Sequence, residues 1–173
     1  MTRSRPTACL TLMCLLILPL AATAGDPVYE ADAIVGIWST ELNDDDANSQ
    51  VEVYANDGKY EGRIVWLSSP VYAEDEPEGE PGTPRLDHRN TDEALRQRPL
   101  MGLVLMTGFE HNGQNKWEDG RIYDPESGKT YDAKFTMKDP DTLELFGYVK
   151  VGFAKLGRNS AWTRVITEEA VSE

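Results

Sequence analysis

The chain has very little of the chemistry on which enzymes and metal sites depend. Its 173 residues include two cysteines and two histidines. Both cysteines, Cys9 and Cys14, lie in the apolar N-terminal stretch, so a chain cut after Ala24 would have no disulfide, no thiol nucleophile and no cysteine metal site. His88 and His111 lie in two separate expected loops. An isolated histidine in a loop is more often a solvent-facing polar residue than a catalytic base. We therefore expect no catalytic residues, no metal and no cofactor, with a hydrolase as a minor alternative.

Cations are also scarce. Lysine and arginine number 17 against 30 acids, for a net charge of −13. Residues 1–24 hold two arginines and no acid, so their removal would leave 15 cations against 30 acids, a net charge of −15. Nucleic-acid binding needs a basic surface that neutralises phosphates, which this composition excludes as a plausible function. The same charge argues against an anionic membrane surface and favours an acidic protein that is soluble outside the cytoplasm.

Long apolar runs are missing apart from one near the start. Residues 8–20 follow Arg3 and Arg5, and the run is too short to span a bilayer. An A-x-A cleavage pattern then ends at Ala24. We expect residues 1–24 to be a signal peptide and residues 25–173 to be one periplasmic or secreted domain. A membrane anchor is the alternative, and no stable membrane insertion is expected after cleavage.

Helical periodicity is almost absent, whereas apolar and polar residues alternate between turn-forming stretches. Short turns such as residues 56–58 and 125–128 make successive strands antiparallel. An eight-stranded meander with no open edge is an up-and-down barrel, so the predicted fold is an all-β antiparallel barrel. The eight expected strands are residues 33–40, 50–55, 59–67, 100–109, 117–124, 129–137, 142–149 and 160–166.

One long insertion, residues 68–99, separates the third and fourth expected strands. Its first half is acidic and rich in proline and glycine, which predicts a solvated loop that is mobile over residues 74–82. Its second half predicts one or two helical turns over residues 90–97. The 100–109 segment is apolar on both faces, so we expect this second half to cover it.

A calcium loop is the one metal site whose spacing can be tested. Asp44, Asp46 and Asn48 stand two residues apart, as the first three ligands of such a loop do. Ser49 stands where the glycine should be, and Ala55 stands at the closing glutamate position. We interpret this stretch as an acidic turn with weak, adventitious calcium binding at most.

A polar cluster precedes the 100–109 segment. Its members are Asp87, Asn90, Asp92, Arg96 and Arg98. One interpretation is a polar cluster at the barrel rim that orients a ligand. The alternative, which we favour, is that caps and ion pairs pin the insertion to the barrel.

Four motifs in order resemble the bacterial exported family called domain of unknown function 2147. They are GIW at 36–38, DHRNTDEALRQRPLMGL at 87–103, GRIYDPESGKTYDAK at 120–134 and GYV with LGRNSAWTRV at 147–165. The resemblance covers residues 34–165 and implies a lipocalin-like (calycin) barrel. It carries over no catalytic residue. The stretch KVGFAK at 150–155 departs from the pattern, so the resemblance does not define the last loop.

An eight-stranded barrel has an interior that side chains fill or that holds one small ligand. The expected inward residues are Trp38, Val51, Val53, Ile64, Trp66, Tyr131, Phe135, Leu143 and Leu145, with room left at Gly36, Gly62, Gly102 and Gly147. Tyr60, Trp66, Tyr131 and Phe135 are the candidate ligand-binding residues. Trp66 either lines a cavity or plugs the core, because it shares a face with Tyr60, Gly62 and Ile64.

The predicted function is an exported binding protein of the cell envelope for a small, mostly apolar molecule. The alternative is a non-enzymatic protein-binding module of the periplasm, with a solid barrel core and a cell-envelope protein as its partner. An open cavity would favour the first function. A solid core with an exposed apolar patch would favour the second.

Trp38 and Arg164 are the expected closure pair of the barrel. Gly36 shares a face with Trp38, and we expect the glycine to make room for the indole. The first and last strands pair when a meander closes, and lipocalin-like proteins place an arginine across such a tryptophan. The resemblance implies that Arg164 takes this place, where its charge would stabilise the barrel through a cation–π contact.

Overall fold

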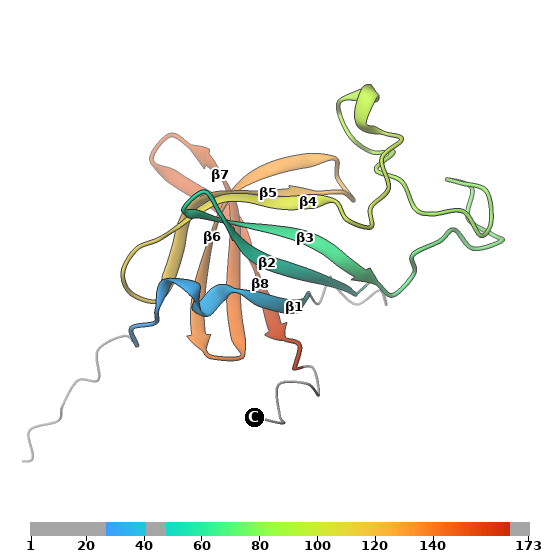
Figure 1. The fold of residues 1–173 in the computed structure, drawn as a ribbon. Helices are drawn as coiled ribbons and strands as arrows, with labels where there is room; N and C mark the ends of the chain where they lie inside the picture. The colour runs from blue at the N-terminus through green and yellow to red at the C-terminus, as the bar shows by residue number, and fades with distance from the viewer. Residues whose placement is uncertain (1–26, 41–47, 167–173) are drawn as a thin grey trace, which may run out of the picture.

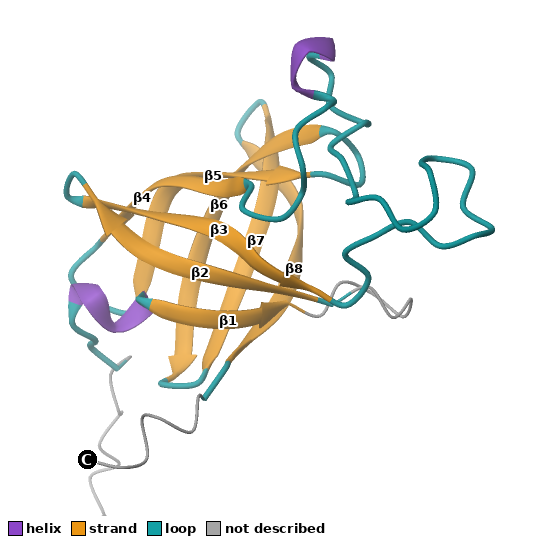
Figure 2. Cartoon of the chain, turned by 45° about the vertical axis from the view of Figure 1, so that its right-hand side comes forward, coloured by secondary structure: helices purple, strands orange, loops and turns teal. Residues whose placement is uncertain are grey.

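The computed structural model describes residues 27–40 and 48–166, which form a closed barrel of eight antiparallel strands in sequence order (Figures 1 and 2). The strands are β1 Gly36–Thr40, β2 Ser49–Asn56, β3 Lys59–Leu67, β4 Val104–His111, β5 Lys116–Asp124, β6 Lys129–Asp139, β7 Thr142–Val151 and β8 Ala154–Arg164. In the described ranges the helical elements are two 3-10 turns, η1 Ala31–Ile34 and η2 Glu93–Leu95. The predicted all-β, eight-stranded barrel with an insertion between its third and fourth strands is therefore confirmed.

Two predicted features lie outside the described residues. They are the signal peptide over residues 1–24 and the acidic turn that contains Asp44 and Asp46. Within the described ranges, no helix has the length and apolar character needed to cross a membrane.

The fourth strand starts later than predicted, and its pattern has a local cause. Residues 100–103 form a turn in which the Leu103 N–H donates to the Leu100 carbonyl at 3.1 Å. A register shift then lets Leu105 and Met106, which are adjacent in sequence, both be buried. Met101 and Val104 remain exposed. The expectation that both faces of this segment are covered is therefore wrong. The turn and the register shift explain how adjacent apolar residues can be buried without a second covering layer.

The last hairpin is longer than predicted. β7 and β8 pair from Thr142↔Thr163 to Val151↔Ala154, around a two-residue turn in which Gly152 has a positive φ of 60°. Glycine is favoured at the first position of such a turn because it adopts that conformation without strain. The KVGFAK stretch is therefore the tip of this hairpin.

One end of the barrel is sealed by η1, which Figure 2 shows at the opposite end from the insertion. Three aromatic side chains donate hydrogen bonds to the η1 segment. Trp38 Nε1 donates to the Ile34 carbonyl at 2.8 Å, Trp117 Nε1 to the Ala31 carbonyl at 3.0 Å, and the Tyr60 hydroxyl to Asp32 Oδ1 at 2.7 Å. Buried aromatic groups need such partners for their polar atoms. The fully buried core beneath η1 includes Trp38, Val53, Phe109, Trp117, Phe135, Met137 and Leu143.

Arg164 completes this sealed end. It pairs with Trp38 across the β1–β8 seam, and its guanidinium carbon lies 4.1 Å from the centre of the indole. Its nitrogens donate to the carbonyls of Ala33, Val35 and Pro140 at 2.7, 3.0 and 2.8 Å. Burial lowers the pKa of this guanidinium. Arg164 is thus held at the seam by an indole and three carbonyl oxygens.

Gly36 makes room for Arg164 rather than for the Trp38 indole. A Cβ added at Gly36 would lie 2.7 Å from Arg164 Nη1, and the φ of this glycine is 139°. Most side chains would be strained in that conformation. The predicted reason for the glycine is therefore wrong, although it does belong to the closure of the barrel.

Candidate functional site

A cavity opens at the other end of the barrel, on the side of the insertion. Its volume is about 1450 Å³, and it is lined by the ends of strands and by the insertion. Its inner wall is apolar and consists of Val51, Ile64, Leu105, Ile122, Leu145 and Trp162. The same eight strands thus form a packed core at one end and an open cavity at the other.

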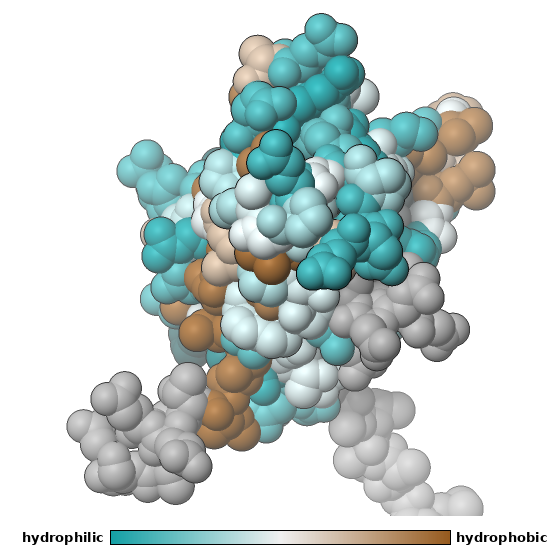
Figure 3. All heavy atoms as spheres, turned by 90° about the vertical axis from the view of Figure 1, so that its right-hand side faces the viewer, coloured by the Kyte–Doolittle hydropathy of each residue, from teal (hydrophilic) through white to brown (hydrophobic). Residues whose placement is uncertain are grey.

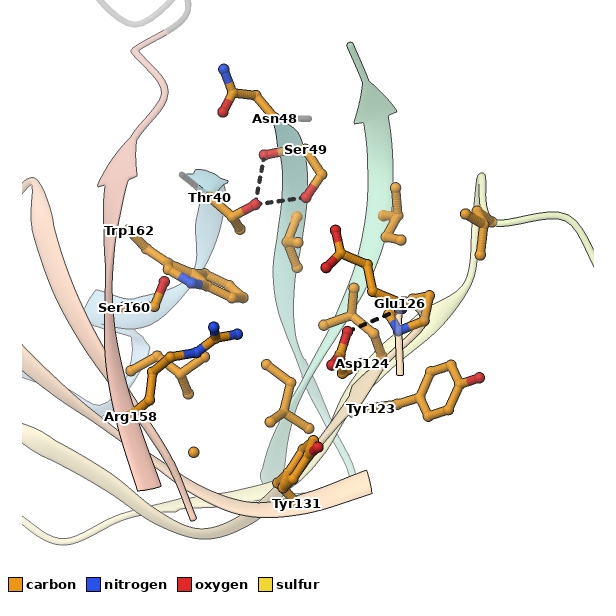
Figure 4. Close-up of a pocket in the computed structure, with 18 of the residues that line it drawn as sticks. Thr40, Asn48, Ser49, Tyr123, Asp124, Glu126, Tyr131, Arg158, Ser160 and Trp162 are labelled. Carbon is orange, nitrogen blue, oxygen red and sulfur yellow. Dashed lines mark hydrogen bonds between the residues drawn. The ribbon is translucent and has the colours of Figure 1, made fainter. Parts of the chain in front are cut away.

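Several polar side chains also line this cavity, as Figure 4 shows. The Thr40 and Ser49 hydroxyls hydrogen-bond to each other at 2.7 Å, so they satisfy one another. Arg158 and Ser160 project from β8, and Tyr131 projects from β6. The cavity therefore combines an apolar floor with a few polar groups, as binding sites for small molecules do.

The mouth of the cavity is acidic on one side. Asp124 and Glu126 lie at the β5–β6 turn, across the cavity from Arg158 (Figure 4). Asp124 accepts hydrogen bonds from the Glu126 N–H at 3.0 Å and the Ser127 hydroxyl at 2.6 Å. On the insertion side, Glu76 forms an ion pair with Arg85 at 2.5 Å. The face seen in Figure 3 is mostly hydrophilic at its centre, with apolar areas at its upper right and lower left.

The insertion is built around Tyr72. This side chain is buried, its hydroxyl accepts a hydrogen bond from the Leu86 N–H at 3.1 Å, and Arg85 stacks on its ring at 5.3 Å. A Cβ at Gly79 would lie 2.1 Å from the ring, so residues 74–82 fold back against it. The acidic half of the insertion therefore packs against the aromatic ring of Tyr72, which its acidic composition did not predict. Its mobility stays a prediction.

The predicted polar cluster pins the insertion to β5. Asp87 is 1% exposed and accepts hydrogen bonds from Arg98 Nε and Asn90 Nδ2, both at 2.8 Å. The Tyr123 hydroxyl, from β5, donates to the other oxygen of Asp87. Burial and this hydrogen bond raise the pKa of Tyr123 to about 12. Both carboxylate oxygens of Asp87 thus accept hydrogen bonds within the protein, which ties the insertion to β5, and a role of the cluster in binding a ligand stays a prediction.

Asp92 and Arg96, the other two members of the predicted cluster, both contact Asn90. The Asp92 carboxylate caps η2 by accepting from the Ala94 N–H at 3.0 Å, and Arg96 Nε donates to the Asn90 carbonyl at 2.8 Å. The helix expected over residues 90–97 is therefore shorter than predicted, a single 3-10 turn. Tyr123 is the member that sequence reasoning missed, since it contacts the cluster from a distant strand.

Comparison with known proteins then identifies the family. Residues 36–164 match the model of a family described as an uncharacterized protein conserved in bacteria, DUF2147. The chain belongs to this family. No curated protein matches the chain.

A solved structure supports the fold of this DUF2147 chain. This chain is similar in structure to HP1028 from the human pathogen Helicobacter pylori, a protein described as belonging to the lipocalin family. The TM-score is 0.61, with 22% sequence identity over 79% of this chain and 85% of that chain. At this identity the likeness shows the fold alone. It confirms the predicted lipocalin-like barrel.

The four candidate ligand-binding residues of the DUF2147 chain are not brought together. Tyr131 lines the open cavity, whereas Phe135 is fully buried in the packed half. The Tyr60 hydroxyl donates a hydrogen bond to Asp32 in η1, and burial with this hydrogen bond raises the pKa of Tyr60 to about 12. The structure therefore places one of the four, Tyr131, in the lining of the cavity, and their roles in binding stay predictions.

Trp66 does not point into the barrel. Its side chain is 44% exposed, and a register shift between β2 and β3 pairs Val51 with Ile64 but Gln50 with Trp66. The extra residue in β3 reverses the face of every residue after it, so Leu67 lines the cavity instead. The inward orientation expected for Trp66 is wrong for this reason.

In the described ranges, no three histidine, cysteine, aspartate or glutamate side chains are placed to share a metal ion. The polar groups that line the cavity can donate and accept hydrogen bonds, as the binding of a small molecule requires.

Proposed function

We propose that this protein binds a small, mostly apolar molecule in the open end of its barrel. The observation that carries the proposal is the cavity of about 1450 Å³ with an apolar floor, formed by a barrel whose other end is packed. Apolar surface that solvent reaches favours burial by a ligand, at roughly 25 cal/mol for each Å² removed from water. The lipocalin-like fold supports the same function.

Filling the cavity tests this proposal. A Cβ added at Gly147 would meet Ile122 Cγ2 at 3.9 Å and no nearer atom, so a leucine there can extend into the cavity. We expect Gly147→Leu to abolish the binding of a fluorescent apolar probe without loss of thermal stability. Phe146→Leu, at the neighbouring position on the outer face, is the matched control and should bind as the wild type does. Equal probe binding by all three proteins would refute the cavity as the site.

The natural ligand can be sought directly. We expect native mass spectrometry of protein purified from its own cells to show a bound small molecule. The same measurement on Gly147→Leu should show the molecule displaced.

We further propose that the protein is exported to the cell envelope or secreted. The support is the pattern of residues 1–24, in which basic residues precede a short apolar run and an A-x-A site. Mass spectrometry of the mature protein should give an N-terminus at Gly25. A mature chain that retains residues 1–24 would contradict export with cleavage.

A protein-binding module is the second candidate, and the β7–β8 hairpin favours it. Phe153 at its tip is fully exposed, and Val151 and Leu156 are more than half exposed. Exposed apolar residues clustered in this way are typical of interaction sites. A photocrosslinking amino acid at position 153 should form one discrete protein adduct in cells, and the same group at position 121 on the outer wall should not. Absence of an adduct would leave the cavity as the functional site.

A further inference from the structure

Arg158 is an exposed, charged side chain that lines the cavity and has no hydrogen-bond or ion-pair partner among residues 27–40 and 48–166. It lies in β8 on the inward face, opposite Gly147 of β7, and Figure 4 shows its guanidinium directed into the cavity. The other arginines in these ranges form hydrogen bonds or ion pairs, apart from Arg121 on the outer wall. A guanidinium offers five donors in a planar fork. In this cavity those donors face space that a ligand would occupy.

Ser160 supplies a second unpaired group on the same wall. It lies two residues from Arg158 on the same face of β8, and its hydroxyl oxygen is buried with no hydrogen-bond partner in the described part of the chain. Leaving a buried hydroxyl unpaired is unfavourable, because it has given up its hydrogen bonds to water. A ligand oxygen in the cavity would satisfy this hydroxyl after a rotation about its side-chain bond. Arg158 and Ser160 together form a donor pair that favours an acceptor, and Arg158 favours a negative one.

The position of this pair in the cavity defines the shape of the ligand. Along β8, Arg158 is exposed and lies nearer the mouth, followed by the half-buried Ser160 and then the buried Trp162. Leu145, which pairs with Ser160, and Trp162 continue the apolar wall inward. A ligand that fits this order has an anionic head near the mouth and an apolar tail towards the floor.

Two acidic residues at the mouth favour some anions over others. Asp124 and Glu126 stand on the opposite side of the mouth, and neither forms an ion pair with a described residue. They repel an anion at the β5–β6 turn and leave the β8 wall as the favourable position. A carboxylate carries one negative charge and matches the planar guanidinium, whereas a phosphate adds charge next to two acids.

From this juxtaposition we propose that the cavity takes a single-chain amphiphilic carboxylate, whose head group binds Arg158 and Ser160. The inference rests on the proposed function of the cavity and goes beyond it by naming the ligand class and the residues that recognise it. No covalent step is involved.

The test compares three dodecyl compounds by calorimetric titration at neutral pH: dodecanoate, its neutral methyl ester and dodecyl phosphate. We expect wild-type protein to bind dodecanoate more tightly than the other two. Arg158→Gln should weaken dodecanoate binding by roughly tenfold to a hundredfold, the range expected for lost hydrogen bonds to a charged group. Affinity for the ester should stay unchanged, which also shows that the variant is folded. Ser160→Ala should weaken dodecanoate binding by a smaller factor.

Arg121→Gln is the matched control. Arg121 is an exposed arginine on the outer wall without a partner among the described residues, so its removal changes net charge equally. We expect it to leave both affinities unchanged. Equal losses in Arg158→Gln and Arg121→Gln, equal affinity for acid and ester, or tighter Arg158-dependent binding of the phosphate would each overturn the inference. Failure of acid and ester alike to bind would instead contradict the proposed function.

Discussion

Arg164 and Arg158 lie six residues apart on the same inward face of β8, and their surroundings differ. Arg164 is fixed at the sealed end by the Trp38 ring and by three carbonyl oxygens. Arg158 reaches the open cavity, where the described residues offer it no partner. Because its guanidinium is partly buried and its nitrogens have partners, Arg164 stabilises the barrel. Exposure to an unfilled space leaves the second charge available to a ligand, so the role of an arginine here depends on which end of the barrel it faces.

The largest effect that the comparison predicts is at the sealed end. Trp38→Ala should lower the free energy of unfolding by about 3–5 kcal/mol, because it removes a fully buried indole and leaves a cavity. Urea denaturation followed by circular dichroism measures the loss. Trp66→Ala is the control, and its half-exposed side chain should cost much less. Equal losses would contradict the division into a packed end and an open end.

Arg164→Ala should lower the free energy of unfolding by about 1–3 kcal/mol, which is less than the loss for Trp38→Ala. The reason for the loss is that three carbonyl oxygens lose a charged donor. The double variant with Trp38→Ala should lose less than the sum of the two single losses. The difference should be roughly 0.5–2 kcal/mol, the strength of the cation–π contact. Neither variant should change ligand preference at the open end. Strictly additive losses would show that the two side chains do not act as a pair.

Alkaline pH should weaken both ends of the barrel through two tyrosines. Burial and hydrogen bonds to Asp32 and Asp87 raise the pKa of Tyr60 and Tyr123 to about 12, against about 10 in the unfolded chain. The folded protein therefore holds these protons more tightly than the unfolded chain does. Their contribution is complete below pH ~10 and is lost as the pH rises through about 12.

Urea denaturation over that pH range measures this loss of stability. Tyr60→Phe should remove the part that belongs to the sealed end, and Tyr123→Phe the part that belongs to the anchor of the insertion. A pH profile that neither variant flattens would exclude these tyrosines as its cause.

The smallest effect is expected at the open end. Arg158→Gln should change the free energy of unfolding by less than about 0.5 kcal/mol, because the side chain has no hydrogen bond or ion pair with a described residue to lose. Thermal denaturation in the absence of ligand checks this expectation. A loss as large as that of Arg164→Ala would mean that Arg158 supports the barrel, and the contrast between the two arginines would disappear.

The site could be predicted from the sequence only where local pattern decides the outcome. Tyr131 was placed correctly in the interior, because β6 alternates without interruption as far as Met137. Trp66 was misplaced, because one extra residue in β3 reverses the faces of the strand beyond it. Tyr123 was missed, since its partners Asp87 and Asn90 come from an insertion more than thirty residues away. Arg158 was missed because the alternation of β8 is weak where few of its side chains are buried.

By itself the sequence determined the number of strands, their antiparallel order and the pairing of the first with the last. Alternation with a period of two and short turns leave few other arrangements, and a closed meander brings Trp38 next to Arg164. Only the tertiary structure decided where the barrel is filled and where it stays open. The space left inside depends on bulges, on η1 as a plug and on the position of the insertion, all of which arise between distant segments. Those contacts made Arg164 a structural residue and left Arg158 in the cavity.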